Sequence, residues 1–318
     1  MQEVKGSGKD ALFLDSGDLL FKKFIAPLSE SESKMASEKA HLIIETLNLT
    51  GCSAVGIGDD DLSLGKDFLV EISKKANFPF LSANVLDEDS GKLLFQPYLL
   101  KEFNGLRIGI FSLLSPDFLG PADPRRKGLT LQPPVEVAQN MVKELQSKTD
   151  LIILLSHLGY PKDVELAQTV SGIHVIVGGH TGVQLMNPPV IKNTVILQTP
   201  PKGMYVGRFD LSFMSGESSF CNIATKHSLE RNLNNIKNRI ATGNASETEK
   251  AQWRMTKEGF ERQLQQLQGK NEFSNTILPL TEQMKDHPDV GKMVEAYKVK
   301  FPEPQKPAPQ KSAPNSAR

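Results

Sequence analysis

Cysteine is nearly absent from this sequence, and the shortage limits the kinds of site that the chain can build. Only two cysteines, Cys52 and Cys221, occur among 318 residues, and neither belongs to a CxxC or CxxCH pattern. Clustered-cysteine zinc sites, CxxC redox motifs and haem attachment are therefore excluded. The two cysteines lie far apart in the sequence and could pair, but we expect them to be buried thiols.

The chain also lacks an excess of charge and a long apolar run. Lys plus Arg and Asp plus Glu both number 37, so no overall basic field would recruit nucleic acid or an acidic membrane. No apolar stretch is long enough to span a bilayer. The residues after Met1 contain no apolar core of a signal peptide, so this start, taken alone, favours a cytoplasmic protein.

What the sequence does contain is a pair of apolar segments that both lead to a histidine. Leu151–Leu155 and Val175–Val177 are typical of buried parallel strands, and they are followed by His157 and His180. Ligands bind at the carboxyl ends of strands in an open α/β sheet, so both histidines are candidate metal ligands. Either one alone fits a core histidine, but the glycines before His180 allow close backbone approach and favour a metal or anion site.

Two earlier strand-like segments lead to carboxylates. Ala11–Leu14 precedes a turn that ends at Asp18, and Gly51–Ile57 precedes the run Asp59–Asp61. Asp18 alone fits a common turn or helix-capping aspartate. Crowded carboxylates repel one another unless a cation or water absorbs the charge, and the run alone fits a solvated acidic turn that caps the following helix.

The other segments up to His180 alternate between helical and extended patterns. We expect helices over 29–47, 62–75 and 134–146, a strand over 80–83 that ends at Asn84, and a hairpin of strands 98–103 and 106–114 around Asn104-Gly105. Together with the two histidine strands, these elements predict an α/β fold.

After His180 the pattern becomes antiparallel and then helical. We expect strands over 195–199, 205–213 and 218–225 in a second sheet packed on the first, then helices over 229–240, 246–267 and 286–300. Ser246 and Glu249 match a capping box. The residues 301–318, rich in Pro, Gln, Ser and Ala, predict a disordered tail. The domain division is therefore 1–225, 226–300 and 301–318.

Four of these strand ends can supply ligands to one metal ion. The candidate ligands are Asp18, Asp59, His157 and His180. Two imidazoles with two carboxylates suit Mn²⁺, Fe²⁺ or Zn²⁺ and fit Ca²⁺ poorly. A divalent ion in such a site can activate water for hydrolysis.

The motifs around these residues resemble those of the calcineurin-like metallophosphoesterases, within the 5′-nucleotidase/2′,3′-cyclic phosphodiesterase group. LFLDSGD resembles the GD block, AVGIGDDD takes the place of the GNHE or GNHD block, and LSANV resembles the SANV segment. ILLSHLG and VIVGGHTG carry the two histidines, and VILQTPPKGMYVGRFDLSF resembles the closing QTPxxGxxVGxxDL strands. The blocks run in the family order over roughly 11–213.

The resemblance implies a four-layer α/β/β/α metallophosphoesterase sandwich with a C-terminal helical extension, and it implies roles for single residues. Asp18, Asp59, His157 and His180 correspond to the ligands of one metal, with Asp59 in place of asparagine. Asp60 takes the position of the GNHE histidine, a candidate catalytic acid if its pKa is raised. Asn84, in the SANV segment, is a candidate substrate-binding residue.

Other family features are missing, and among them are ligands of the second metal that the family binds. No DxH block precedes Asp18, and the position of the last ligand of the second metal falls on Gly182. One explanation is a start that lies further upstream; the chain is similar to a subgroup of UshA-like (seleno)proteins, in which an in-frame selenocysteine codon would explain a misplaced start. The other explanation is a site that has diverged, because truncation does not account for Asp60 and Gly182.

The function implied by the resemblance is metal-dependent phosphoester hydrolysis of a small molecule by a metal-activated hydroxide. The alternative is a catalytically degenerate protein of the cell envelope that binds a metal or ligand without turnover. The family implies a periplasmic location. Nothing after Thr225 resembles the base-binding domain of nucleotidases. A protein partner or dimerisation through the amphipathic segment 229–267 is a further hypothesis.

Overall fold

The computed structural model describes residues 6, 8–24, 27–214 and 216–302 of the chain. The predicted disordered tail lies, from residue 303 onward, outside the described residues. No helix in the described part of the chain combines the length and apolarity needed to cross a bilayer.

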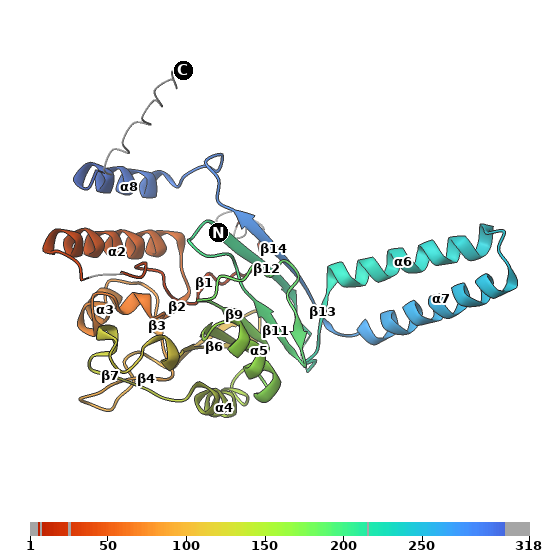
Figure 1. Ribbon diagram of the computed structural model, residues 1–318, viewed down its shortest axis with the longest axis horizontal. Coiled ribbons are helices and arrows are strands. Elements are labelled where there is room, and N and C mark those ends of the chain that lie inside the picture. The colour runs from red at the N-terminus through yellow and green to blue at the C-terminus, as the bar shows by residue number, and fades with distance from the viewer. Residues whose placement is uncertain (1–5, 7, 25–26, 215, 303–318) are drawn as a thin grey trace, which may run out of the picture.

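Two sheets form the centre of the fold (Figure 1). The smaller is a three-stranded parallel sheet made of β1 (Leu14–Asp15), β2 (Ala54–Gly56) and β3 (Phe80–Leu81). The larger is a six-stranded sheet in the order β10 (Val190–Ile191), β11 (Thr194–Leu197), β9 (Val175–Gly178), β8 (Leu151–His157), β6 (Leu106–Leu114) and β5 (Tyr98–Phe103). Its four middle strands are parallel, and β5 and β10 are antiparallel edges.

Helices cover the outer face of each sheet. They are α2 (Glu30–Thr50) and α3 (Lys66–Ser73) beside the small sheet, and α4 (Pro134–Leu145) and α5 (Tyr160–Thr169) beside the large one. Side chains of β8 alternate between two cores, as the two-residue period of a strand requires. Ile152 and Leu154 pack with α4 and α5, whereas Ile153 and Leu155 pack between the sheets. This is the predicted α/β sandwich, with helices outside and two sheets within.

Several local predictions are confirmed closely. The Asn104-Gly105 turn joins β5 and β6 at Phe103 and Leu106. The predicted capping box at Ser246 begins α7 (Glu247–Leu267). The structure shows a second capping box, at Ser29, which begins α2. α7 lies beside α6 (Ile223–Thr242), and this hairpin extends away from the sheets (Figure 1). α8 (Pro288–Lys300) lies along α2, where Tyr297 donates to the Met35 carbonyl oxygen and Lys300 pairs with Glu38.

The strands after His180 differ from the prediction. β11 is part of the large sheet and not of a second one, because Val195 pairs in parallel with Val175 of β9. Of the three strands predicted after His180, β12 (Tyr205–Ser212) and β13 (Phe220–Asn222) do belong to a separate sheet, which has three strands. β13 is shorter than expected because the Asn222 side chain accepts a hydrogen bond from the Ala224 amide and starts α6 there.

The middle strand of this separate sheet is β14 (Asn271–Pro279), between β12 and β13. Residues 271–279 lie between the helices predicted over 246–267 and 286–300, and the sequence pattern predicts no strand there. The buried residues of β14, Asn271, Phe273 and Ile277, are too few and too mixed in polarity to mark a strand in the sequence alone. The division near residues 225 and 300 stays a prediction, with β14 tying the helical hairpin to the preceding part.

The last pair of strands is a short antiparallel ribbon of β4 (Val85–Asp87) and β7 (Leu129–Leu131). In the described residues, three single-turn 3₁₀ helices lie in the loops that follow the carboxyl ends of β2 and β6. They are η1 (Asp60–Leu62), η2 (Pro116–Phe118) and η3 (Pro124–Arg126). These loops contribute side chains to the site described next.

Candidate metal centre

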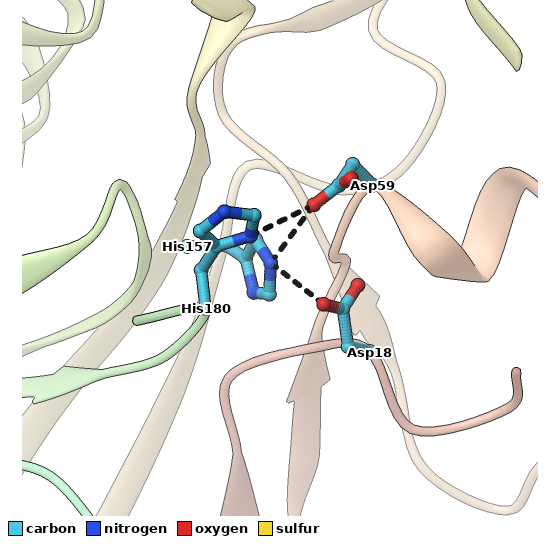
Figure 2. A group of neighbouring side chains, drawn as sticks. All are labelled: Asp18, Asp59, His157 and His180. Carbon is cyan, nitrogen blue, oxygen red and sulfur yellow. Dashed lines mark hydrogen bonds and ion pairs between the residues drawn. The ribbon is translucent and has the colours of Figure 1, made fainter. Parts of the chain in front are cut away.

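The four predicted ligands converge between the two sheets. Ligand atoms of Asp18, Asp59, His157 and His180 all lie within 4.8 Å of one another. Figure 2 shows the two imidazoles facing the two carboxylates. Within the described part of the chain, these four residues are the one group of three or more His, Cys, Asp or Glu side chains that could hold a metal ion. The prediction that these four residues meet is confirmed, whereas their role as ligands stays a prediction.

Strand register explains why side chains so distant in sequence meet. His157 is the last residue of β8, and Ser156 pairs with Gly178 at the end of β9, so His157 and His180 leave adjacent parallel strands at one edge. In the small sheet, Asp15 of β1 pairs with Val55 of β2, which brings the loops after both strands together. The carboxyl ends of both sheets therefore supply the centre.

The His157 ring is oriented as a metal ligand requires. Its Nδ1 lies 2.9 Å from the Ser16 carbonyl oxygen. Because a carbonyl can only accept, Nδ1 carries a proton, and Nε2 is the nitrogen that faces the carboxylates. Nε2 is buried without a hydrogen-bond partner, and it lies 3.2 Å from Asp18 Oδ2 and 3.2 Å from Asp59 Oδ1. A nitrogen this close to two carboxylate oxygens needs either a proton of its own or a cation between them, so the donor set fits a divalent metal ion.

The electrostatics of this group point the same way. Burial lowers the pKa of His157, but the adjacent carboxylates of Asp18 and Asp59 outweigh it and raise the pKa to about 10. Burial opposes ionisation of Asp59, yet its contacts with His157 and His180 hold its pKa well below the usual range. Both pKa shifts have the same meaning: positive charge among these side chains is stabilised.

Two of the four residues adopt a backbone conformation that is rare outside glycine. The φ angles of Asp18 and His180 are 59° and 68°. Such left-handed conformations cost energy for most residues and cluster at functional sites. The His180 ring is held by stacking on Phe118, with centroids 3.4 Å apart and an interplanar angle of 10°, and its Nδ1 lies 3.1 Å from Asp59 Oδ1. Packing and backbone together aim His180 at the centre.

Gly58 leaves the space that the carboxylate of Asp18 occupies. A Cβ atom at Gly58 would lie 2.3 Å from Asp18 Oδ1 and 2.7 Å from His157 Cε1. Real Cβ contacts are not this short, and both neighbouring groups belong to the candidate centre. A residue without a side chain is therefore required next to Asp59.

The acidic run Asp59–Asp61 is not the solvated turn that its sequence suggests when taken alone. Asp61 is wholly buried and accepts hydrogen bonds from the amides of Asp18, Leu20 and Gly58. Burial raises the pKa of Asp61 to about 7, and the charge of Asp18 adds to this. Asp61 thus joins the loop after β1 to the loop after β2, and it keeps Asp18 and Asp59 side by side.

Asp60, the candidate acid, lies at the edge of the centre. Its amide donates to Asp18 Oδ1 at 2.8 Å. Burial, followed by the charges of Asp18 and Asp59, raises the pKa of Asp60 to about 6, against the attraction of Arg125. A carboxylic acid with this pKa could donate a proton near neutral pH. The catalytic role of Asp60 remains a prediction.

Arg125 is a residue of the site that the sequence did not reveal. Its Nη1 atom lies 2.8 Å from Asp59 Oδ2 and 2.6 Å from Asp60 Oδ1. The only local signal is the basic DPRRKG segment at 123–128, and nothing in that segment indicates a contact with residues more than sixty positions earlier.

Asn84 does not join the four-residue group. Its side chain is wholly buried, donates to the carbonyl oxygens of Leu114 and Gln132, and accepts from the Leu114 amide. These bonds fasten the chain after β3 to the end of β6. The structure thus gives Asn84 a structural function, and its assignment to substrate binding remains a prediction.

The two cysteines are free thiols, as expected. Cys221 is buried and Cys52 is partly buried. Burial raises the pKa of Cys52 to about 12, so it is an unreactive thiol at neutral pH.

Solved structures that resemble this one define the class of its fold. No protein-family model matches the chain. A solved 5′-nucleotidase precursor from Thermus thermophilus superposes with a TM-score of 0.63 and 23% identity, covering 94% of this chain and 51% of that one. The fold is therefore that of a metallophosphoesterase domain.

Proteins similar in sequence identify the family within this class. A 5′-nucleotidase of Vibrio parahaemolyticus is 30% identical over 256 residues, which cover 68% of this chain and 43% of the relative. The protein UshA of Escherichia coli is 27% identical over 253 residues, with 70% and 44% covered. The chain belongs to the 5′-nucleotidase/UshA family of metallophosphoesterases. It spans less than half the length of these curated relatives.

Proposed function

We propose that this chain is a metal-dependent phosphoester hydrolase acting on a small-molecule phosphoester. The observation that carries the proposal is the convergence of Asp18, Asp59, His157 and His180 within 4.8 Å at the carboxyl edge of both sheets. Membership of a metallophosphoesterase family supports the reaction class. A substrate of the 5′-nucleotide type is the finer proposal, supported by the names of the relatives.

One divalent ion, Mn²⁺, Zn²⁺ or Fe²⁺, suits these four side chains. When bound, it would act as a Lewis acid on a phosphoryl oxygen and lower the pKa of a water molecule. Other residues of the chain orient the side chains that would hold the ion. The Ser16 carbonyl oxygen fixes the His157 tautomer, Phe118 stacks on His180, and the Asp60 amide binds Asp18 Oδ1. Asp60, with a pKa of about 6, is the proposed proton donor to the leaving group.

The location of the protein is also a proposal. Membership of the UshA family supports a periplasmic or cell-envelope location. Dimerisation or partner binding through the α6–α7 hairpin is a separate proposal, supported by the way the hairpin extends from the sheets (Figure 1).

The test combines metal content with hydrolysis. The purified chain is dialysed against Mn²⁺ or Zn²⁺, its metal is counted by elemental mass spectrometry, and the same sample is assayed with p-nitrophenyl phosphate and bis-p-nitrophenyl phosphate. We expect one ion per chain and hydrolysis that is lost in His180→Ala. The control is His227→Ala, because His227 is exposed on α6. Hydrolysis that survives in His180→Ala would overturn the site assignment.

A non-catalytic binding protein of the same fold is the second candidate. It is favoured by the absence, in the part of the chain that the structure describes, of a second group of three metal-binding side chains, and by Gly182, which offers no ligand. A chain that retains one ion but hydrolyses neither substrate would support binding without turnover.

A further inference from the structure

The guanidinium of Arg125 has a partner for every one of its donors. Arg125 lies in η3, and only 13% of its side chain is exposed. A guanidinium carries five N–H groups in one plane. Nε donates to Asp123 Oδ1 at 3.1 Å, and Nη2 donates to Asp123 Oδ2 at 2.8 Å and to the Phe118 carbonyl oxygen at 3.3 Å. Nη1 donates to Asp59 Oδ2 at 2.8 Å and to Asp60 Oδ1 at 2.6 Å. With its donors engaged and little solvent contact, the guanidinium is held in one orientation.

Asp59 turns its two oxygen atoms to different surroundings. Oδ1 lies 3.1 Å from His180 Nδ1 and 3.2 Å from His157 Nε2, whereas Oδ2 accepts from Arg125. The Asp59 side chain is only 5% exposed, so water competes little for either oxygen. Hydrogen bonds between charged partners are also stronger than those between neutral ones. Arg125 therefore occupies one oxygen of Asp59 and leaves the other for the four-residue centre.

Asp18 is held in a similar way, but by a neutral group. Its Oδ1 accepts from the Asp60 amide at 2.8 Å, and its Oδ2 lies 3.2 Å from His157 Nε2. Each carboxylate of the centre thus presents one oxygen to an imidazole and has its other oxygen bound by the protein. The two carboxylates differ in charge balance, because a guanidinium offsets the negative charge of Asp59 and an amide does not offset that of Asp18.

Arg125 also contacts the residue that orients His180. The Phe118 carbonyl oxygen accepts from Nη2, and the Phe118 ring stacks on the His180 ring. Phe118 and Arg125 both belong to the loop after β6, in η2 and η3, whereas Asp59 belongs to the loop after β2. The guanidinium therefore joins two loops of the site. It contacts one candidate ligand directly, Asp59, and a second, His180, through Phe118.

We propose that Arg125 is a positioning residue of the metal centre: by binding Oδ2 of Asp59, it fixes Oδ1 as the single oxygen that Asp59 turns to the centre. The inference rests on the proposed function, since a metal ion at this centre is part of that proposal. A purely structural ion pair would affect folding alone. A positioning role requires in addition that the effect of changing Asp59 on metal affinity depends on the residue at position 125.

The substitution Asp59→Asn reveals this dependence. An amide side chain has one acceptor oxygen and one donor NH₂ group, where the carboxylate has two acceptor oxygens. Beside Arg125, only the amide oxygen can accept from the guanidinium, so the NH₂ group turns to the centre, where it cannot bind a metal ion. Beside Arg125→Gln, the new side chain can accept from that NH₂ group, and the oxygen at position 59 is left to face the ion.

Isothermal titration calorimetry with Mn²⁺ on the full chain measures the dependence. We expect Asp59→Asn to weaken Mn²⁺ binding by more than about tenfold in the native background, the loss typical for residues that only support a ligand, and to cause no further loss in the Arg125→Gln background. Because the two backgrounds are compared, any general effect of Arg125→Gln cancels. Equal losses in both backgrounds would overturn the inference.

Two further backgrounds serve as controls. Arg125→Lys keeps a cationic donor without an acceptor, so Asp59→Asn should weaken Mn²⁺ binding there as it does in the native background. Arg126→Ala is the matched control, because the Arg126 guanidinium lies in the same turn and donates to the Leu119 carbonyl oxygen. The full loss should persist in it. If Arg125→Gln does not fold, Arg125→Met, which also removes the donors, takes its place.

A measurement without metal separates this inference from the proposed function. Urea unfolding in EDTA should show that Asp59→Asn lowers the midpoint less in the Arg125→Gln background than in the native one, because a buried charge that has lost its partner is itself destabilising. A native chain that binds no Mn²⁺ would refute the proposed metal centre. In that case, unequal midpoint shifts in EDTA would support the link between Arg125 and Asp59, and equal shifts would overturn it.

Discussion

The Nδ1 atom of His157 donates to the Ser16 carbonyl oxygen at 2.9 Å, and this bond joins the end of β8 to the turn after β1. It connects the two sheets at the point where their loops carry the candidate ligands. Since it also sets the tautomer, the buried Nε2 atom faces Asp18 and Asp59. The orientation of one ring thus depends on contact between residues 141 positions apart.

Alanine at either histidine should abolish metal retention. His180→Ala is the cleaner variant, because its side chain is 31% exposed and its removal leaves little buried space. His157→Ala also removes a wholly buried ring and should lower the melting temperature. Metal content is measured by elemental mass spectrometry, and His227→Ala should retain the native amount. Metal retained in both site variants would show that these residues are not ligands.

Asp18→Asn should separate charge from backbone conformation. Asparagine tolerates the left-handed φ of 59° at this position, and its oxygen can still accept from the Asp60 amide. The melting temperature should therefore change little. Metal affinity should fall by more than about tenfold, the loss typical for residues that only support a ligand. Titration calorimetry with Mn²⁺ measures the change, and an affinity equal to that of the native chain would show that the charge of Asp18 does not contribute to metal binding.

Gly58→Ala should disrupt the centre without touching a ligand. The new Cβ atom would lie 2.3 Å from Asp18 Oδ1, and overpacking of this kind costs about 1–3 kcal/mol of unfolding free energy. We expect a lower urea midpoint together with reduced metal content. Gly120→Ala is the control, because a Cβ there meets nothing within 4 Å. Equal stability of the two variants would mean that the loop around Gly58 relaxes freely.

Asp163 should make the stability of the fold depend on pH. This wholly buried carboxyl on α5 accepts from the Ser156 hydroxyl, and burial raises its pKa to about 7. The folded chain therefore holds a proton that the unfolded chain releases near pH 4, so the contribution of this group to stability falls as pH rises from about 4 to about 7 and is level above that.

Asp163→Asn removes this dependence. Its unfolding free energy relative to the native chain should rise across the same interval, by on the order of 2–4 kcal/mol for a shift of this size. Urea unfolding at several pH values measures it. Asp89→Asn is the control, because the Asp89 side chain is 92% exposed. A difference between Asp163→Asn and the native chain that does not change with pH would contradict the raised pKa.

Much of the fold was predictable because the signals are local. The Asn104-Gly105 turn sets the register of β5 and β6, and the capping box at Ser246 marks the start of α7. The four candidate ligands were identifiable because each follows an apolar strand, and parallel strands share one carboxyl edge. α5 went unrecognised, although a crossover between the parallel strands β8 and β9 requires an intervening segment.

The sequence by itself determined the α/β class, most element boundaries and the chemical types of the candidate ligands, since periodicity, turn residues and strand ends act over a few neighbouring positions. Only the tertiary structure decided which charges are neutralised and by what. Asp61 is buried by backbone amides of two loops, and Arg125 reaches Asp59 and Asp60 from a distant 3₁₀ turn. Such pairings depend on burial and on side-chain geometry in three dimensions, which no local pattern encodes.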